Sequence, residues 1–421
     1  MRHLWIKGLR LWYNEKEYLE AMECWDTVIE GISWNDLGDS TDRRDIPENG
    51  DFYDYAELLV FMAGCHLDAQ HVITARRYLR RAIQACHANI HSETAIHAIQ
   101  EYVFSYDEEA HQQDDGTEAL AEARRMIAWA IQHKCPHWND PYQRPGYAVL
   151  PLSPANAWYP RNNHPPWCTK LEENYLEIKE EFISLAGIRQ IPTHWPRVGS
   201  GNHRDGAGQH DDKVVRGDWR EIVLFGSGAT KKSAPRTCAL IQQHVPDAVH
   251  LAEEGGGEII LSVLAPNSRI RPHCGTTNLR LTAHLGLSIP MEGRCEIRVR
   301  DTWHGWREGE FIVFDDSFEH EVVNETNESR AVLLIRFWHP LVGAANRQQA
   351  LEAVLQAQEN DINRRFNPPL PPEFGKNVPK RGLRQDSCPR CFQQGYESIQ
   401  VLDCGFAHDV SFTCTCGEPI A

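Results

Sequence analysis

Apolar residues recur at helical spacing through the first third of the chain. Between residues 8 and 32, side chains such as Leu9, Trp12 and Trp25 fall near helical intervals, which is typical of one face of a helix. Small residues such as Gly8 lie where two helices could approach closely. The pattern returns in residues 61–88, and further helices are expected around 93–113 and 117–134.

These helix pairs weakly resemble tetratricopeptide repeats. The polar stretch 35–51 makes their spacing irregular, whereas true repeats keep a fixed period. The pattern predicts a helical, tetratricopeptide-like domain over residues 1–145, and it fits a plain helical bundle equally well. True repeats would offer a groove to a peptide or protein partner.

The composition changes after Cys135. Residues 137–168 are rich in Pro, Trp and Asn, which predicts an ordered but irregular connector. A further helix is expected over residues 169–187. The polar, glycine-rich stretch 198–218 is long enough to form a mobile lid or an insertion.

From residue 219 onward the pattern is one of short strands separated by turn residues. Strand-like segments cover residues 219–225, 257–266, 279–290, 295–303, 310–324 and 329–340. Strands of this length and spacing are typical of a double-sheet jelly roll, or double-stranded β-helix. We therefore expect an α+β protein whose jelly-roll domain covers residues 146–375.

Cysteines crowd into the end of the chain. Two close pairs follow a proline-rich, basic linker, and such pairs in a reducing compartment favour tetrahedral zinc over disulfides. We predict a zinc-ribbon-like module over residues 376–421; free thiols in a tail are the alternative, and Cys404 and His408 complicate the choice of ligands. The predicted structural zinc ligands are Cys388, Cys391, Cys414 and Cys416.

Composition and charge exclude several classes of protein. The 421 residues are 41% hydrophobic and 24% charged, as in ordinary globular domains. The net charge of -16 and the pI near 5.7 argue against non-specific nucleic-acid binding. The sequence contains no run of eighteen apolar residues, the length that would predict a membrane span, and the amino terminus has no uninterrupted apolar segment. We expect a cytoplasmic protein.

Two stretches of the strand-rich region combine histidines with arginines. His273 lies in the first of them, and a hairpin around residues 324–329 would place His320 and Arg330 on neighbouring strands. The period of two puts Arg330 on one strand face with Val332, Leu334 and Arg336. A buried arginine requires an anion and suits a carboxylate, and imidazoles suit Fe(II). The residues predict iron with a dicarboxylate, or else polar side chains at a barrel mouth.

The segment from about Asp218 to Pro340 resembles the aspartyl/asparaginyl β-hydroxylase family of Fe(II)- and 2-oxoglutarate-dependent oxygenases. The resemblance covers the whole oxygenase core in order. It rests on the stretches GDWREIVLF, APRTCALI, SVLAPNSRIRPHCGTTNLRLTAHLGLSIP, FDDSFEHEV and WHP, and on the spacing of Arg330.

The resemblance implies a set of site residues and the cofactors Fe(II), 2-oxoglutarate and O2. It implies that His273 and His320 bind the iron. It further implies that Ser262 and Arg330 bind the distal carboxylate of 2-oxoglutarate. His284 would line the pocket for cofactor and catalysis, and Arg280 would be an active-site arginine.

Two positions depart from related patterns. The general oxygenase triad has Asp or Glu two residues after the first histidine, where this chain has Gly275; the family shares that gap and is thought to fill it with water. Thr282 stands where members acting on acidic side chains often carry an arginine, which weakens the expectation of an aspartyl substrate. We interpret Asp316 as orienting the site or pairing with Arg280, and Asp315 as ending a strand.

The implied function is hydroxylation at the β-carbon of an Asp, Asn or related residue in a protein or peptide. The alternatives are a hydroxylase of a small molecule or lipid headgroup, and a catalytically silent peptide-binding module. The predicted partners are a polypeptide or small-molecule substrate, and a protein bound through the helical domain; nucleic acid is not expected. Trp303 and Trp306 fit a substrate groove or simple packing.

Overall fold

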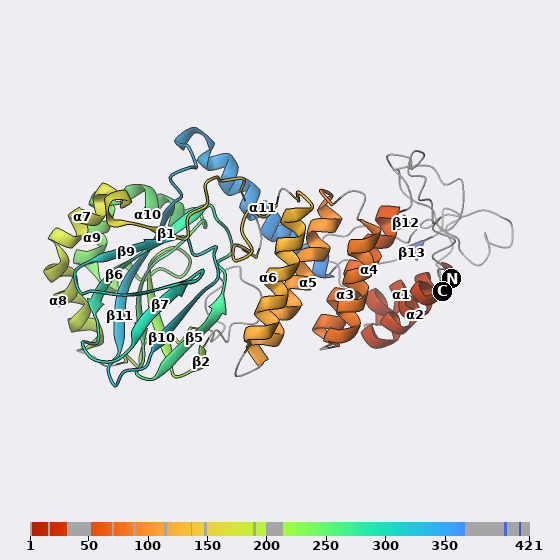
Figure 1. Ribbon diagram of the computed structural model, residues 1–421, viewed down its shortest axis with the longest axis horizontal. Helices are drawn as coiled ribbons and strands as arrows, with labels where there is room; N and C mark the ends of the chain where they lie inside the picture. The colour runs from red at the N-terminus through yellow and green to blue at the C-terminus, as the bar shows by residue number, and fades with distance from the viewer. Residues whose placement is uncertain are drawn as a thin grey trace. The chain divides into compact units, whose positions relative to one another are not determined.

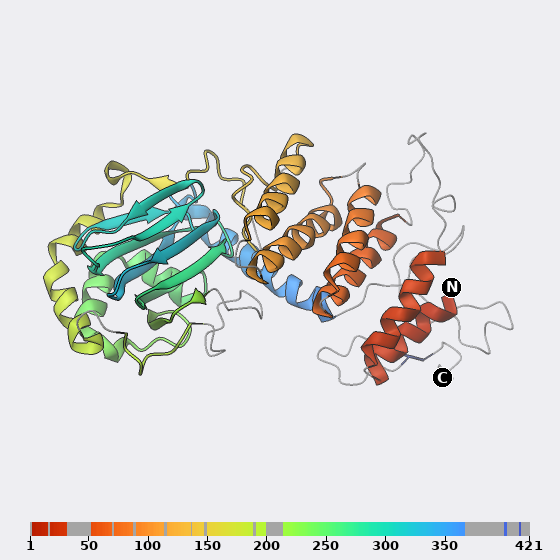
Figure 2. The same cartoon turned by 60° about the horizontal axis from the view of Figure 1, so that its bottom comes forward.

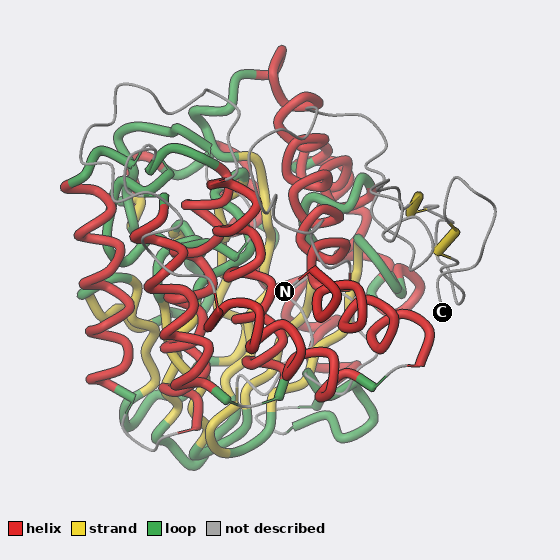
Figure 3. The backbone as a smooth tube through the Cα atoms, turned by 90° about the vertical axis from the view of Figure 1, so that its right-hand side faces the viewer, coloured by secondary structure: helices red, strands yellow, loops and turns green. Residues whose placement is uncertain are grey.

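A computed structural model gives the fold, and Figures 1 and 3 show its helices, strands and loops. The structure describes residues 2–15, 17–31, 52–69, 71–86, 90–112, 116–135, 137–146, 150–187, 191–198, 214–366, 400–401 and 412–413. The chain divides into two compact units, one of Met1–Tyr102 with Arg364–Ala421, and one of Val103–Asn363. No described helix is long and apolar enough to cross a membrane.

The first unit is helical in its described amino-terminal part. Gly8 lies so close to the next helix that an added Cβ would be 2.3 Å from Trp25 Nε1, which confirms the predicted close approach. The segment predicted over 8–32 is two helices separated by a π-helical turn, and the tetratricopeptide assignment stays a prediction. The elements are α1 (Arg2–Arg10), η1 (Leu11–Glu15), α2 (Tyr18–Gly31), α3 (Phe52–Asp68) and α4 (Val72–Ala85), followed by α5 (Glu93–Gln112), which runs on into the second unit.

The second unit contains two antiparallel sheets, as the strand pattern predicted. Their orders are β1-β9-β6-β11-β4-β3 and β2-β5-β10-β7-β8. Its strands are β1 (Trp158–Tyr159), β2 (Val214–Arg216), β3 (Trp219–Phe225), β4 (Ile259–Leu264), β5 (Ser268–His273), β6 (Arg280–Ser288), β7 (Cys295–Val299), β8 (Thr302–Gly305), β9 (Phe311–Phe314), β10 (His320–Asn324) and β11 (Arg330–Trp338). Its helices are α6 (Thr117–Gln132), α7 (Pro166–Glu173), α8 (Tyr175–Ala186), α9 (Pro235–His244), α10 (Pro246–Glu253) and α11 (Arg347–Phe366), the last running into the first unit.

The period of two along β11 separates two cores. Leu333 and Ile335 pack with side chains of α7–α10, which cover the outer face of the six-stranded sheet (Figure 2). Val332 instead packs with Ile297 and Phe314 in the core between the sheets. Alternation along a strand therefore directs Arg330 and Arg336 into the barrel interior, which confirms the predicted common face.

Some expectations differ from the structure. The segment 295–303 forms parts of two strands, and 310–324 contains two strands joined by a turn. β1, β2 and β5 were not predicted as strands. The second unit begins at Val103, so the predicted boundary at residue 145 lies inside it. Residues 199–213 of the predicted loop, and all four predicted zinc ligands, lie outside the described residues.

Candidate active site

His273 and His320 face each other across two paired strands. The two residues are direct partners in the antiparallel pair of β5 and β10, and their ring centroids are 4.1 Å apart. The next paired residues are Ile270 and Val322, so β5 has one extra residue at this point. Such a bulge redirects the strand, and it allows both Ile270 and His273 to face the interior although they are three residues apart.

Backbone carbonyls fix the tautomer of both imidazoles. His273 Nδ1 lies 2.7 Å from the carbonyl oxygen of Arg271, and His320 Nδ1 lies 2.9 Å from that of Phe318. A carbonyl only accepts, so each Nδ1 carries the proton and each Nε2 carries the lone pair. This is the usual arrangement of a metal-binding histidine, and the two rings therefore fit an iron ion.

Gly275 leaves no room for a third protein ligand at the expected position. An added Cβ would lie 2.9 Å from Asp316 Oδ1 and 3.0 Å from the Asp316 carbonyl oxygen. Within the described part of the chain, no group of three His, Cys, Asp or Glu side chains could hold a metal. Among the described residues, the site therefore offers two imidazoles to a metal ion.

Arg330 lies buried without an anionic partner. It opens β11, is 2% exposed, and makes no ion pair with any residue that the structure describes. Its guanidinium carbon lies 4.7 Å from the centroid of the Trp306 ring, and burial lowers the pKa of Arg330 to about 10. Ser262 is also 2% exposed, lies on the adjacent strand β4 and accepts a 2.8 Å hydrogen bond from Trp219 Nε1. A charged group in this position fits a carboxylate from a ligand.

His284 points into the same interior from β6. Trp306 Nε1 donates to His284 Nδ1 at 3.3 Å, and His284 Nε2 is buried with no partner among the described residues. Burial, together with the charges of Arg330 and His320, lowers the pKa of His284 well below its ordinary value. His284 is therefore a neutral hydrogen-bond donor. Sequence reasoning left Trp306 without a role, because a single tryptophan in a loop carries no periodic signal.

A balanced group of charges lies at the other end of β11. Arg336 pairs with Glu258, and its Nε lies 3.6 Å from Asp316 Oδ2. Arg280 donates to the Gly256 carbonyl oxygen at 2.7 Å. Burial raises the pKa of Asp316, but Arg280, Arg336 and His320 outweigh it, and the pKa lies below its ordinary value. Asp316 is thus an ionised residue beside the imidazoles, consistent with the predicted orienting role.

The comparisons with known proteins agree with this geometry. Residues 172–340 match the family described as aspartyl/asparaginyl beta-hydroxylase. The matched residues include most strands of the two sheets, so the barrel is similar to this family. The chain is 32% identical over 222 residues to the aspartyl/asparaginyl beta-hydroxylase of Mus musculus and 31% identical over 219 residues to that of Homo sapiens.

These β-hydroxylase matches cover part of each protein. They span 50% of this chain but only 27% and 26% of the mouse and human relatives. Aspartate beta-hydroxylase domain-containing protein 2 of Xenopus tropicalis is 31% identical over 222 residues, 55% of its length. A solved oxidoreductase of the 2OG-Fe(II) oxygenase family from Burkholderia pseudomallei is 12% identical, with a TM-score of 0.27, over 44% of this chain and 96% of that one. That likeness is too low to bear on function.

The barrel brings together the residues that the sequence singled out. Their individual roles stay a prediction, but all lie on strands that border one interior. The structure places Ser262 on β4, His273 on β5, Arg280 and His284 on β6, His320 on β10, and Arg330 on β11.

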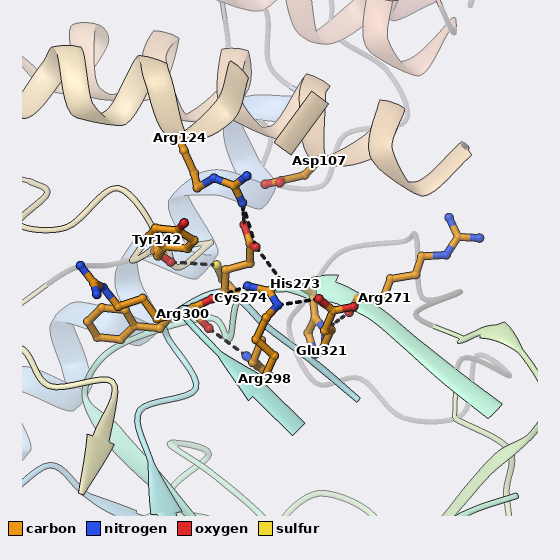
Figure 4. Close-up of polar contacts among 12 residues, drawn as sticks. Asp107, Arg124, Tyr142, Arg271, His273, Cys274, Arg298, Arg300 and Glu321 are labelled. Carbon is orange, nitrogen blue, oxygen red and sulfur yellow. Dashed lines mark hydrogen bonds and ion pairs between the residues drawn. The ribbon is translucent and has the colours of Figure 1, made fainter. Parts of the chain in front are cut away.

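A buried glutamate next to His320 in the chain connects the barrel to residues that precede the matched segment. Glu319 has a fully buried side chain and pairs with three arginines. Burial raises the pKa of Glu319, but the guanidiniums outweigh it and hold the pKa below its ordinary value. Figure 4 shows Arg124 reaching from its helix toward the part of the barrel where His273 and Cys274 lie. The distances to Glu319 are 3.0 Å from Arg124, 2.8 Å from Arg144 and 2.8 Å from Arg298.

The pKa of Asp315 is raised, whereas the pKa of the neighbouring Asp316 is lowered. Asp315 follows the end of β9, as predicted, and is 1% exposed. It accepts hydrogen bonds from the Ser317 amide and hydroxyl at 2.9 and 2.5 Å, and has no cationic partner among the described residues. Burial raises the pKa of Asp315 to about 8. The folded protein therefore holds a proton here near neutral pH that the unfolded chain, with a pKa near 4, releases.

We expect Asp315→Asn to change how stability depends on pH. The contribution of Asp315 to folding is fully present below about pH 4 and is lost as the pH rises toward about 8. Asparagine stays neutral at every pH. The free energy of unfolding of the variant should therefore rise relative to that of the wild type over this range, by a few kcal/mol at most. Denaturant unfolding of both proteins between pH 4 and 8 measures the difference. Asp247→Asn, at a side chain that is 71% exposed, is the control; a difference between Asp315→Asn and wild type that stays constant with pH would contradict the assignment.

Proposed function

We propose that this protein is an Fe(II)- and 2-oxoglutarate-dependent hydroxylase that acts on the β-carbon of an Asp, Asn or related residue in a protein or peptide. The observation that carries the proposal is Arg330, a buried guanidinium with no anionic partner among the described residues. It shares one barrel interior with the facing imidazoles of His273 and His320. An interior that binds iron and a dicarboxylate explains both features.

The residues present fit both cofactors. His273 and His320 would hold iron through Nε2, the nitrogen that their carbonyl contacts leave unprotonated. Arg330 would pair with the distal carboxylate of 2-oxoglutarate, to which the Ser262 hydroxyl would donate. When bound, iron and 2-oxoglutarate supply the oxidising chemistry that uses O2, releases succinate and CO2, and hydroxylates a substrate C–H bond.

The chain's own residues position the bound groups and shield the site from water. Neutral His284 would donate its Nε2 proton to an oxygen of a bound group without introducing a second positive charge beside Arg330. Phe314, Phe318 and Val322 pack in the core between the sheets and exclude water from this side of the site. A dry, preorganised interior strengthens each polar contact and guides the reaction toward the substrate.

A polypeptide substrate is favoured by the helical part of the chain, which is of a size and kind that binds peptides. Thr282 leaves the acidic character of the target residue open, and Arg336 lies opposite it on β11. The test is to incubate purified full-length protein with Fe(II), 2-oxoglutarate and a cell lysate, and to search tryptic peptides for the gain of one oxygen. Oxygen gained at Asp or Asn supports the proposal; oxygen gained only by small molecules or lipids supports the alternative. No succinate with any fraction would indicate a silent binding module.

Arg330→Met should weaken the binding of 2-oxoglutarate. A charge-assisted contact is worth about 1.5–3 kcal/mol, so the apparent affinity should fall by about ten- to a hundred-fold. The same change removes an uncompensated buried charge and should leave the cofactor-free fold as stable as before, or more stable. Calorimetric titration with 2-oxoglutarate measures the first effect, and thermal unfolding the second. Arg307→Met, at a side chain that is 82% exposed, is the matched control; unchanged affinity in Arg330→Met would point to Arg336 instead.

A further inference from the structure

We propose that Trp306 is a positioning residue that prepares two groups for 2-oxoglutarate: it sets the tautomer of His284 and supports the charge of Arg330. The inference rests on the proposed function for the identity of the ligand. The tautomer and the arginine contact belong to the protein alone and can be tested without any ligand.

The first contact is a hydrogen bond that can run in only one direction. Trp306 is 5% exposed, and its Nε1 lies 3.3 Å from His284 Nδ1. An indole N–H donates and never accepts, so His284 Nδ1 must accept and the ring proton must sit on Nε2. His284 Nε2 is buried and has no partner in the described part of the chain. Trp306 therefore creates a donor that faces the barrel interior.

The second contact uses the face of the same indole. The guanidinium carbon of Arg330 lies 4.7 Å from the ring centroid of Trp306. An aromatic face attracts a cation without occupying its N–H donors. A carboxylate partner would instead compete with the ligand for those donors. The indole thus helps Arg330 to remain charged in a buried place while its hydrogen bonds stay available.

The loop that carries Trp306 is anchored beside His284. Trp306 lies in the loop between β8 and β9, and Gly286 lies two residues after His284. The Gly286 amide donates to the Glu310 carbonyl oxygen at 3.2 Å, and the Gly286 carbonyl oxygen accepts from the Gly309 amide at 2.9 Å. A Cβ at Gly286 would lie 2.3 Å from the Arg307 carbonyl oxygen. Only glycine allows this approach, which holds the indole in register with the imidazole.

The decisive measurement is the protonation of the His284 ring nitrogens. Two-bond ¹H–¹⁵N correlation spectra of ¹⁵N-histidine-labelled full-length protein, free of metal, should show His284 protonated on Nε2, with His284→Gln identifying the signal. In Trp306→Phe the preference for this tautomer should be lost, and calorimetric affinity for 2-oxoglutarate should fall by roughly five- to thirty-fold, as expected for one lost hydrogen bond. Trp303→Phe, on β8, is the matched control because its ring lies 4.3 Å from the guanidinium carbon of the exposed residue Arg294.

The outcomes separate this inference from the proposed function. A wild-type His284 that carries its proton on Nδ1 overturns the inference whatever any variant does. So does a Trp306→Phe protein that keeps both the wild-type tautomer and the wild-type affinity. If the tautomer responds as expected but wild-type protein binds no 2-oxoglutarate, the positioning role of Trp306 stands and the proposed cosubstrate is wrong.

Discussion

Replacing either His273 or His320 with alanine is expected to abolish 2-oxoglutarate turnover while leaving the barrel folded. The two rings face each other at 4.1 Å, and Gly275, which packs against Asp316, leaves no room for a third protein ligand. A site with two protein ligands that loses one retains a single imidazole, which is too weak to hold iron at working concentrations. The fold should persist because neither ring belongs to the apolar cores.

Succinate formation and Mn(II) binding, the latter followed by electron paramagnetic resonance, measure this effect. His304→Ala is the matched control, since that residue is exposed on β8 and its ring lies at a tilt to that of Trp158, with centroids 4.2 Å apart. It should keep turnover. Wild-type succinate production by either His273→Ala or His320→Ala would show that the iron assignment is wrong.

Glu319→Ala should lower the free energy of unfolding of the second unit by about 3–5 kcal/mol, because it leaves buried arginines without their common counter-ion. Glu319 is 0% exposed, and Arg144, which it pairs with, is nearly as buried. The loss should also weaken metal binding, since Glu319 directly precedes His320 and its ion pairs with Arg124, Arg144 and Arg298 fix this part of the chain.

Thermal and denaturant unfolding, with Mn(II) titration, test both parts of this expectation. Glu173→Gln is the control: its ion pair with Lys170 is exposed, with side chains 53% and 54% accessible, and such pairs are worth about 0–1 kcal/mol. Glu319→Gln retains the shape of the side chain and two hydrogen-bonding atoms. Its loss of unfolding free energy should lie between the losses of Glu319→Ala and Glu173→Gln. A Glu319→Ala protein as stable as Glu173→Gln would mean that water replaces the carboxylate freely.

The sequence predicted those strands whose period of two is unbroken. In β11 the alternation of Arg330, Val332, Leu334 and Arg336 is continuous, and the structure has all four on one face. β5 was missed because its bulge interrupts the period and Pro272 lowers its strand propensity. The same bulge directs His273 inward, so a local pattern could not show how the two imidazoles meet.

Other features depend on contacts between distant residues. Arg124 and Glu319 are 195 positions apart, and nothing in either local stretch points to the other. The roles of Trp306 and Gly286 likewise arise only when a loop folds back on a strand. By contrast, the family resemblance assigned six site residues, which lie in two of the five matching stretches and at the position of Arg330. The zinc-ribbon and tetratricopeptide assignments stay predictions.

The arginines around Glu319 bear on how the barrel can be handled in the laboratory. The segment that matches the family begins at residue 172, yet two of the three cations that neutralise Glu319 come from positions 124 and 144. A recombinant fragment cut at the family border would carry a buried carboxylate with only Arg298 to balance it. A truncated protein should therefore keep α6 and the connector, because they supply two of the three arginines that pair with Glu319.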